Sequence, residues 1–232
     1  MKISDRVLDL ATQIQQIPAP TFDEIGRAEM IADRFLQENL FDVEIDELGN
    51  VFARLPGDDQ SHPIVVSAHS DTVFPRETDL AFKRDPDKIY GPGIGDNSLG
   101  VAGLFGLIWE LRQRQIRLSG DIWFVSNVCE EGLGDLKGMR AVVERFGNRP
   151  LAYLILEGMA YGEVFHRGLV QTPGSRGGNA EPQTDPLRRI RRVKRNRIFV
   201  RGNVRGRERS FRGRTENTET AKIEQHHVRI GS

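Results

Sequence analysis

Residues 63–72, PIVVSAHSDT, hold a short apolar run that ends in a histidine and an aspartate. A run of this kind is typical of a strand that is covered on both faces of a sheet. Similar apolar runs follow at residues 121–126 and 151–156, and helical patterns at residues 99–111 and 137–146 separate the three runs. Strands that alternate with helices predict an α/β fold with a mostly parallel sheet and helices on both of its faces.

The N-terminal part of the chain adds two helices and a hairpin to this prediction. Apolar residues recur at helical spacing over residues 3–14. Thr21 and Glu24 have the spacing of a capping box, which predicts a second helix that begins there and runs to about Asn39. Alternating apolar residues between 43 and 55, interrupted by a Gly-Asn pair, predict the hairpin.

The formal net charge of zero conceals two unlike segments. Residues 1–170 carry 17 Lys and Arg against 27 Asp and Glu, a balance of −10, whereas residues 171–232 carry 16 against 6, a balance of +10. Only 13 of the last 62 residues are apolar, too few to offset the entropy of ordering them. We therefore expect an α/β domain over residues 1–170 and an irregular or disordered Arg- and Gly-rich tail over residues 171–232.

The sequence shows no sign of a membrane or an oxidising compartment. Cys129 is the single cysteine, so no disulfide can form within the chain, as is typical of a reducing compartment. The N-terminal residues lack the apolar core of a signal peptide, and no run approaches the ~18 apolar residues of a membrane span. We expect a soluble cytoplasmic protein that does not engage a membrane.

Acidic residues and a histidine follow the three predicted buried strands. His69 and Asp71 end the first, Glu130 and Glu131 the second, and Glu157 the third. In open α/β sheets, ligands bind beyond the carboxyl ends of the strands, so these side chains should converge. Asp96, in a Gly-rich segment before the helix at residues 99–111, should reach the same edge. One imidazole and several carboxylates suit Zn²⁺ or another borderline divalent ion, with Co²⁺ and Mn²⁺ as alternatives.

The spacing within each segment suggests distinct roles. His69 and Asp71 share a face of an extended chain, so Asp71 can accept the second ring N–H of His69 and orient it. Neighbouring Glu130 and Glu131 point different ways, so one can bind a metal while the other faces the attacking water. Asp96 could bridge two ions. Taken singly, each has a plainer explanation: a core histidine, a turn or helix-capping aspartate, and a solvated glutamate pair.

Together these segments resemble a known family, the co-catalytic zinc metallopeptidases that include acetylornithine deacetylase, succinyl-diaminopimelate desuccinylase, peptidase T and carboxypeptidase G. The resemblance covers about residues 5–170 and rests on four motifs in the family's order. They are AHSDTV at residues 68–73, GPGIGDN at 91–97, CEEG at 129–132 and LEG at 156–158. The family commonly has Thr or Pro where this chain has Cys129.

The resemblance implies a role for each residue. His69 and Glu157 would bind one zinc ion, Glu131 would bind the other, and Asp96 would bridge them. Asp71 would orient His69. Glu130 would be the general base, which takes a proton from the attacking water and passes it to the leaving amine.

After residue 170 the chain departs from the family pattern. A lid and dimerisation domain, a histidine for the oxyanion and a last histidine ligand are expected there, but none is recognisable, so we expect no family-type dimer. The abrupt change to Arg- and Gly-rich sequence suggests a truncated or out-of-frame reading of a longer gene. Translating the other two frames beyond codon 170 tests this hypothesis, and finding no lid-like sequence in them would contradict it.

The leading prediction is a metal-dependent hydrolase of amide bonds in small peptides or N-acyl amino acids, with doubtful activity in the chain as written. The first alternative is a catalytically inactive, metal-binding remnant. The second is a basic tail that binds nucleic acid, which the Arg clusters would allow but charge runs alone do not favour. Comparing nucleic-acid binding by the full chain and by a chain ending at Val170 separates this alternative from the others.

Overall fold

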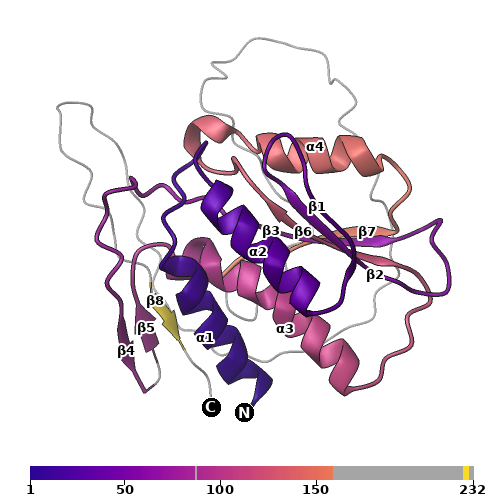
Figure 1. Ribbon diagram of the computed structural model, residues 1–232, viewed down its shortest axis with the longest axis horizontal. Helices are drawn as coiled ribbons and strands as arrows, with labels where there is room; N and C mark the ends of the chain where they lie inside the picture. The colour runs from indigo at the N-terminus through magenta and orange to yellow at the C-terminus, as the bar shows by residue number, and fades with distance from the viewer. Residues whose placement is uncertain (87, 159–226, 230–232) are drawn as a thin grey trace, which may run out of the picture. The chain divides into compact units, whose positions relative to one another are not determined.

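A five-stranded sheet forms the centre of the structure (Figure 1). The computed structural model describes residues 1–86, 88–158 and 227–229. In the order of the strands across the sheet, the bounds are β1 Phe41–Ile45, β2 Val51–Leu55, β6 Ile122–Asn127, β3 Ile64–His69 and β7 Ala152–Ile155. All three predicted apolar runs and the predicted hairpin are therefore strands of one sheet.

The pairing of these strands is mixed, so the prediction of a mostly parallel sheet is confirmed only in part. β3 runs parallel to both β6 and β7, whereas β2 runs antiparallel to both β1 and β6. The antiparallel part comes from the β1–β2 hairpin, which adds to the sheet beside β6. Only β2 runs opposite to the other four strands, and the three strands that lead to the candidate site are directly paired in parallel.

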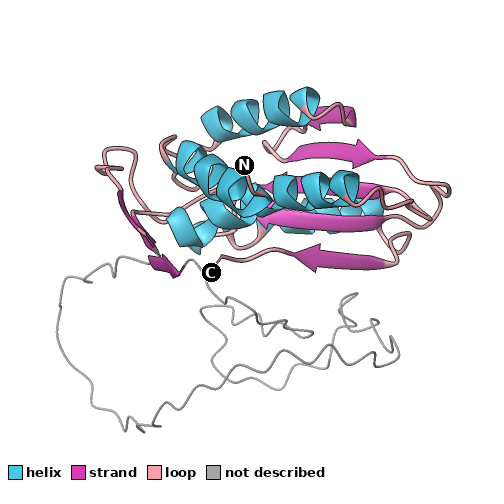
Figure 2. Cartoon of the chain, turned by 90° about the horizontal axis from the view of Figure 1, so that it is seen from below, coloured by secondary structure: helices cyan, strands magenta, loops and turns pink. Residues whose placement is uncertain are grey.

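Helices cover both faces of this sheet, as predicted. On one face lie α1 (Ile3–Gln15), α2 (Ile25–Gln37) and α3 (Leu99–Gln113), and on the other lies α4 (Lys137–Phe146) (Figures 1 and 2). Side chains alternate between the two faces along each strand. In β3, Val66 packs in the core that includes the first three helices, and its neighbour Val65 packs in the core with α4.

Strand β7 is more exposed than its sequence suggests. An apolar run over residues 151–156 predicts a strand covered on both faces, but Leu154 is 47% exposed and Ile155 is 56% exposed. The reason is its position, because within the described residues β7 pairs with β3 alone and lies at the edge of the sheet. A run of apolar residues cannot distinguish a central strand from an edge strand.

A second, three-stranded sheet joins β4 (Lys83–Asp85), β5 (Lys88–Tyr90) and β8 (His227–Arg229). β8 is the only part of residues 171–232 that the structure describes, so the prediction of an irregular tail lies largely outside the described residues. Among the described residues, no helix is long and apolar enough to cross a membrane.

The contact between α2 and α3 depends on a stacked aromatic pair. Phe35 is fully buried, and its ring centroid lies 4.7 Å from that of Phe105. We expect Phe35→Leu to lower the free energy of unfolding by about 1–2 kcal/mol, because it loses ring stacking and leaves part of the volume unfilled. Urea denaturation measures the change. An unchanged midpoint would show that this pair does not hold the helices together.

Candidate metal centre

Strand register brings the predicted residues to one edge of the sheet. In the parallel pair of β3 and β6, His69 lies opposite Asn127, so Glu130 and Glu131 follow just beyond the end of β6. In the pair of β3 and β7, Ser67 lies opposite Ile155, which brings Glu157 level with His69. The convergence expected from the sequence is confirmed for all three strands.

Asp96 reaches this edge from a π-helical turn, Ile94–Ser98, that precedes α3. Its backbone is extended (φ −119°, ψ 93°), and the helix-capping role that the sequence left open belongs instead to Asn97, whose Oδ1 accepts the N–H of Gly100 at 2.9 Å. Asn97 Nδ2 also donates to the carbonyl oxygen of Leu156 at 2.8 Å. This side chain therefore ties the segment of Asp96 to that of Glu157.

The close packing of these two segments requires a glycine. A Cβ atom at Gly158 would lie 1.9 Å from the carbonyl oxygen of Gly95, so no larger residue fits. The glycine of the LEG motif thus has a steric role, because it lets the chain after β7 approach the segment that carries Asp96.

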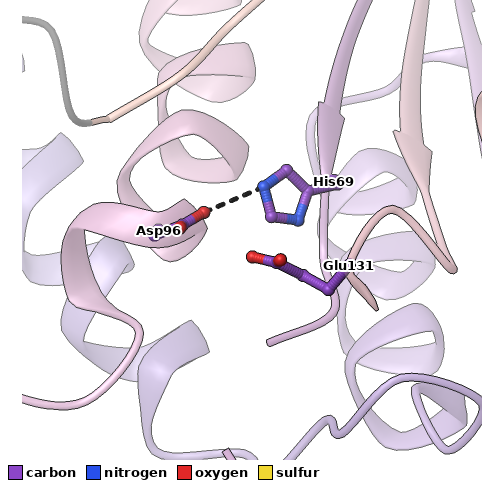
Figure 3. Close-up of side chains that lie close together, drawn as sticks. All are labelled: His69, Asp96 and Glu131. Atoms are coloured by element: carbon purple, nitrogen blue, oxygen red, sulfur yellow. Dashed lines mark ion pairs between the residues drawn. The ribbon is translucent and has the colours of Figure 1, made fainter. Parts of the chain in front are cut away.

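His69, Asp96 and Glu131 form a group that could hold a metal ion, with one ligand atom from each within 4.8 Å of the others. His69 Nε2 lies 3.0 Å from Asp96 Oδ1. Figure 3 shows the imidazole and both carboxylates turned toward a common point between β3, the turn before α3 and the segment after β6.

Glu157 and Glu130 lie beside this group rather than within it. Glu157 Oε2 is 3.7 Å from His69 Nε2, and its side chain is 42% exposed. The group that is close enough for one ion therefore contains Glu131, whereas the resemblance pairs Glu157 with His69. Glu130 is not a member of this group, although the charges of His69, Glu157, Asp71 and Asp96 all act on its carboxyl.

Asp71 is fully buried behind His69. Its carboxylate accepts the backbone N–H groups of Glu130 and Glu131, both at 2.9 Å, and the hydroxyl of Thr21 at 2.9 Å. His69 Nδ1 lies 3.1 Å from the main-chain oxygen of Asp71 and 3.5 Å from its carboxylate. The closest partner of Nδ1 is thus the carbonyl oxygen of Asp71, where its carboxylate was expected. Donation from Nδ1 leaves Nε2 as the ring atom that faces Asp96.

The crowding of carboxylates around one buried imidazole changes the pKa values of the group. Burial alone would lower the pKa of His69, but hydrogen bonds with Asp71, Asp96 and Glu157 outweigh it and raise the pKa to about 12. Burial, together with the charge of Asp96, raises the pKa of Glu131 to about 7. Burial also raises the pKa of Glu130. A bound cation would relieve this repulsion, so the donor set and its charge both fit a divalent metal ion.

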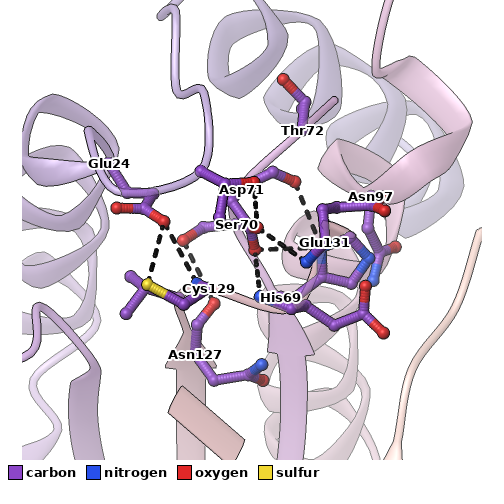
Figure 4. A network of polar contacts seen from close by, with 12 residues as sticks. Glu24, His69, Ser70, Asp71, Thr72, Asn97, Asn127, Cys129 and Glu131 are labelled. Carbon is purple, nitrogen blue, oxygen red and sulfur yellow. Dashed lines mark hydrogen bonds and ion pairs between the residues drawn. The ribbon is translucent and has the colours of Figure 1, made fainter. Parts of the chain in front are cut away.

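Three further side chains support the site from the start of α2 and the segment before it, and two of them, Thr21 and Glu24, were predicted to form a capping box. Thr21 and Glu24 form no capping box, since α2 begins at Ile25 and no side chain caps its first turn. Thr21 donates to Asp71, and Glu24 Oε1 accepts the backbone N–H of Cys129 at 3.1 Å (Figure 4). Arg27, only 1% exposed, donates to the carbonyl oxygen of Ser70 at 2.7 Å.

Cys129 is buried. Burial, with the nearby charge of Glu24, raises the pKa of its thiol to about 11, so it is protonated at neutral pH. Its Sγ donates to Glu24 Oε1 at 3.6 Å. Cys129 is not among the side chains close enough to share one ion with His69, which agrees with a site made of imidazole and carboxylates.

An imidazole and carboxylates gathered beyond the carboxyl ends of parallel strands are typical of α/β proteins that bind a divalent metal ion. The profile of Peptidase family M20/M25/M40 matches residues 65–226, and the chain belongs to this family. The match includes all six predicted site residues and extends past residue 170, where the recognisable motifs end. This family is metal-dependent, and peptide substrates are typical of it.

Solved structures with a similar fold include peptidases of several kinds. Aminopeptidase PepT from Bacillus cereus aligns with a TM-score of 0.57 and 23% identity over 67% of this chain and 44% of its own. A tripeptidase from Staphylococcus aureus aligns with a TM-score of 0.54 and 23% identity over 67% and 44%. The di-peptidase Dug1p from Saccharomyces cerevisiae gives 0.54 and 14% over 67% and 39%. At these identities the likeness concerns the fold.

The aligned part of the chain spans less than half the length of these three structures. A comparison with curated proteins finds no match.

Proposed function

We propose that this chain carries the metal-binding and general-base residues of a zinc-dependent amidohydrolase that cleaves small peptides or N-acyl amino acids. The observation that carries the proposal is the group of His69, Asp96 and Glu131 with Glu130 next in sequence to the third ligand. Membership of a metallopeptidase family whose typical substrates are peptides supports the same reaction. A cytoplasmic location remains part of this proposal.

In this proposal the position of each residue determines its role. His69, Asp96, Glu131 and Glu157 would hold the ions, with Zn²⁺ the best fit to one nitrogen and several oxygen ligands. When bound, the ions would polarise the scissile carbonyl and lower the pKa of the attacking water. Asp71 holds the Glu130 and Glu131 backbone in place and keeps Nδ1 of His69 turned inward.

Glu130 is the proposed general base. Its raised pKa, caused first by burial, brings the carboxyl closer to the operating pH, where a group can both accept and release a proton. It would take a proton from the attacking water and deliver it to the leaving amine. A glutamine at this position could do neither, while it would preserve the size of the side chain.

Hydrolysis assays with the zinc-loaded full chain test the proposal. We expect weak cleavage of some member of a panel of dipeptides, tripeptides and N-acyl amino acids, and a loss of about 10²–10⁴-fold in kcat in Glu130→Gln. Zinc binding should survive this substitution, because Glu130 lies outside the ligand group. If wild type and Glu130→Gln bind zinc but are equally inert, the chain is a metal-binding remnant and the enzymatic proposal fails.

A further inference from the structure

Three consecutive backbone N–H groups beside the candidate metal centre are held by two buried carboxylates. Those of Glu130 and Glu131 bind Asp71, a neighbour of the metal group. The first of the three, from Cys129, binds Glu24 Oε1 at 3.1 Å (Figure 4). Glu24 is separated from Cys129 by 105 residues and comes from the segment before α2. The two carboxylates thus fix the backbone of the CEEG motif from two sides.

The backbone at Cys129 needs such support. Its φ is 52°, in the left-handed region that costs free energy for a residue with a side chain and persists only where the surroundings enforce it. The turn at Cys129 sets the course of the backbone that carries the next two residues, Glu130 and Glu131, and Glu131 is the member of the metal group that follows it. Glu24 forms the hydrogen bond at the residue where the chain turns.

Glu24 is itself held firmly. It is 5% exposed, and the same oxygen that binds Cys129 also accepts the N–H of Phe22 at 2.9 Å and the thiol of Cys129 at 3.6 Å. Two neighbours in the same segment tie it to the segment after β3, Thr21 through the Asp71 carboxylate and Arg27 through the carbonyl of Ser70. A buried carboxylate used in this way contributes nothing to capping α2.

We propose that Glu24 is a positioning residue for the metal centre, because it holds the turn at Cys129 and thereby aims Glu131 at the metal and Glu130 at the substrate. This inference rests on the proposed function of the same site. This role requires the acceptor oxygen of Glu24 and a side chain long enough to bring that oxygen to the backbone N–H of Cys129. The negative charge of Glu24 is not required.

Variants of the full chain separate these features. Glu24→Ala removes the acceptor, and Glu24→Asp keeps the charge but withdraws the oxygen by one methylene. Glu24→Gln keeps an oxygen that can accept both N–H groups. We expect Glu24→Ala and Glu24→Asp to lower zinc affinity about 10–100-fold and to change the visible spectrum of bound Co²⁺, as substitutions of outer partners of metal ligands do. Glu24→Gln should keep a zinc affinity within about threefold of wild type, with an unchanged spectrum.

Glu38 supplies a matched control. It lies at the other end of α2, where its carboxylate accepts Trp109 Nε1–H at 2.6 Å, far along the helix from the site. Glu38→Ala should lower stability and leave zinc affinity and the Co²⁺ spectrum unchanged. If Glu24→Gln loses as much affinity as Glu24→Ala, or if Glu24→Asp binds like wild type, the positioning role is refuted.

Hydrogen exchange of the metal-free protein tests, independently of metal binding, whether Glu24 holds the backbone N–H of Cys129. The amide of Cys129 should be protected in wild type and Glu24→Gln and should exchange at least ~10-fold faster in Glu24→Asp and Glu24→Ala. Equal protection in all four would overturn the inference. If wild type binds no zinc but shows this pattern of exchange, the proposed function fails. The hydrogen bond between Cys129 and Glu24 is then a structural feature only.

Discussion

Asp71→Ala should lower the free energy of unfolding of the metal-free protein by about 3–5 kcal/mol and weaken zinc binding at least ~10-fold. The carboxylate is fully buried and receives two backbone N–H groups, one hydroxyl and the facing His69 ring. Alanine would leave these donors unpaired in a site that water cannot easily enter. Each lost partner costs on the order of 1–3 kcal/mol, and the buried imidazolium adds to that.

A second buried aspartate provides the control for this substitution. Asp121 is 3% exposed, accepts the backbone N–H of Gly57 at 2.8 Å and pairs with Arg54 at 3.1 Å, but it precedes β6 at the end remote from the site. Asp121→Ala should also reduce stability, with no effect on zinc affinity. Urea denaturation and chelator competition measure the two quantities. Equal zinc affinity in Asp71→Ala and wild type would show that Asp71 acts on folding alone.

Zinc affinity should increase steeply with pH, by about 10²–10³-fold between pH 6 and pH 8. In the metal-free site the pKa of His69 is about 12 and that of Glu131 is about 7. Both groups must lose their protons before they can bind an ion. Below about pH 7 zinc therefore displaces nearly two protons, and between pH 7 and 12 about one, so affinity falls as pH falls through both pKa values.

Calorimetry in buffers of different ionisation enthalpy counts these protons directly. The expected release is close to two protons per zinc at pH 6 and close to one at pH 9. Glu131→Gln should bind zinc more weakly and release about one proton at both pH values, because only His69 then titrates. Zinc binding without proton release at pH 7 would mean that the imidazole is neutral in the metal-free protein, contrary to the carboxylate environment described here.

Much of the site could be predicted because each of its motifs is local. An apolar run followed by His69 and Asp71, and another followed by Glu130 and Glu131, show both a strand and the chemistry at its end. Parallel pairing then brings those ends together, as the register of β3 with β6 confirms. The helix at residues 137–146 was predicted with the bounds that α4 has, because its apolar spacing depends on nothing outside it.

The errors share a physical cause. The spacing of Thr21 and Glu24 is that of a capping box, and in an isolated peptide these side chains would cap α2. In the folded chain Thr21 instead donates to the carboxylate of Asp71, and Glu24 accepts the backbone N–H of Cys129. The two hydrogen bonds of a capping box are therefore not made. Likewise, the apolar composition of β7 predicts burial, but its place at the edge of the described sheet leaves Leu154 and Ile155 about half exposed.

By itself the sequence determined the four helices and the five strands of the central sheet. It also determined that His69 and Glu131 follow strand ends and that Asp96 precedes α3. These properties follow from periodicity and from residue chemistry over a few neighbouring positions. Tertiary structure alone decided that Glu131 joins His69 and Asp96, that Asn97 caps α3 in place of Asp96, and that Glu24 holds Cys129. A hydrogen bond across 105 residues depends on how the segments pack, because only packing brings a buried donor and its acceptor together.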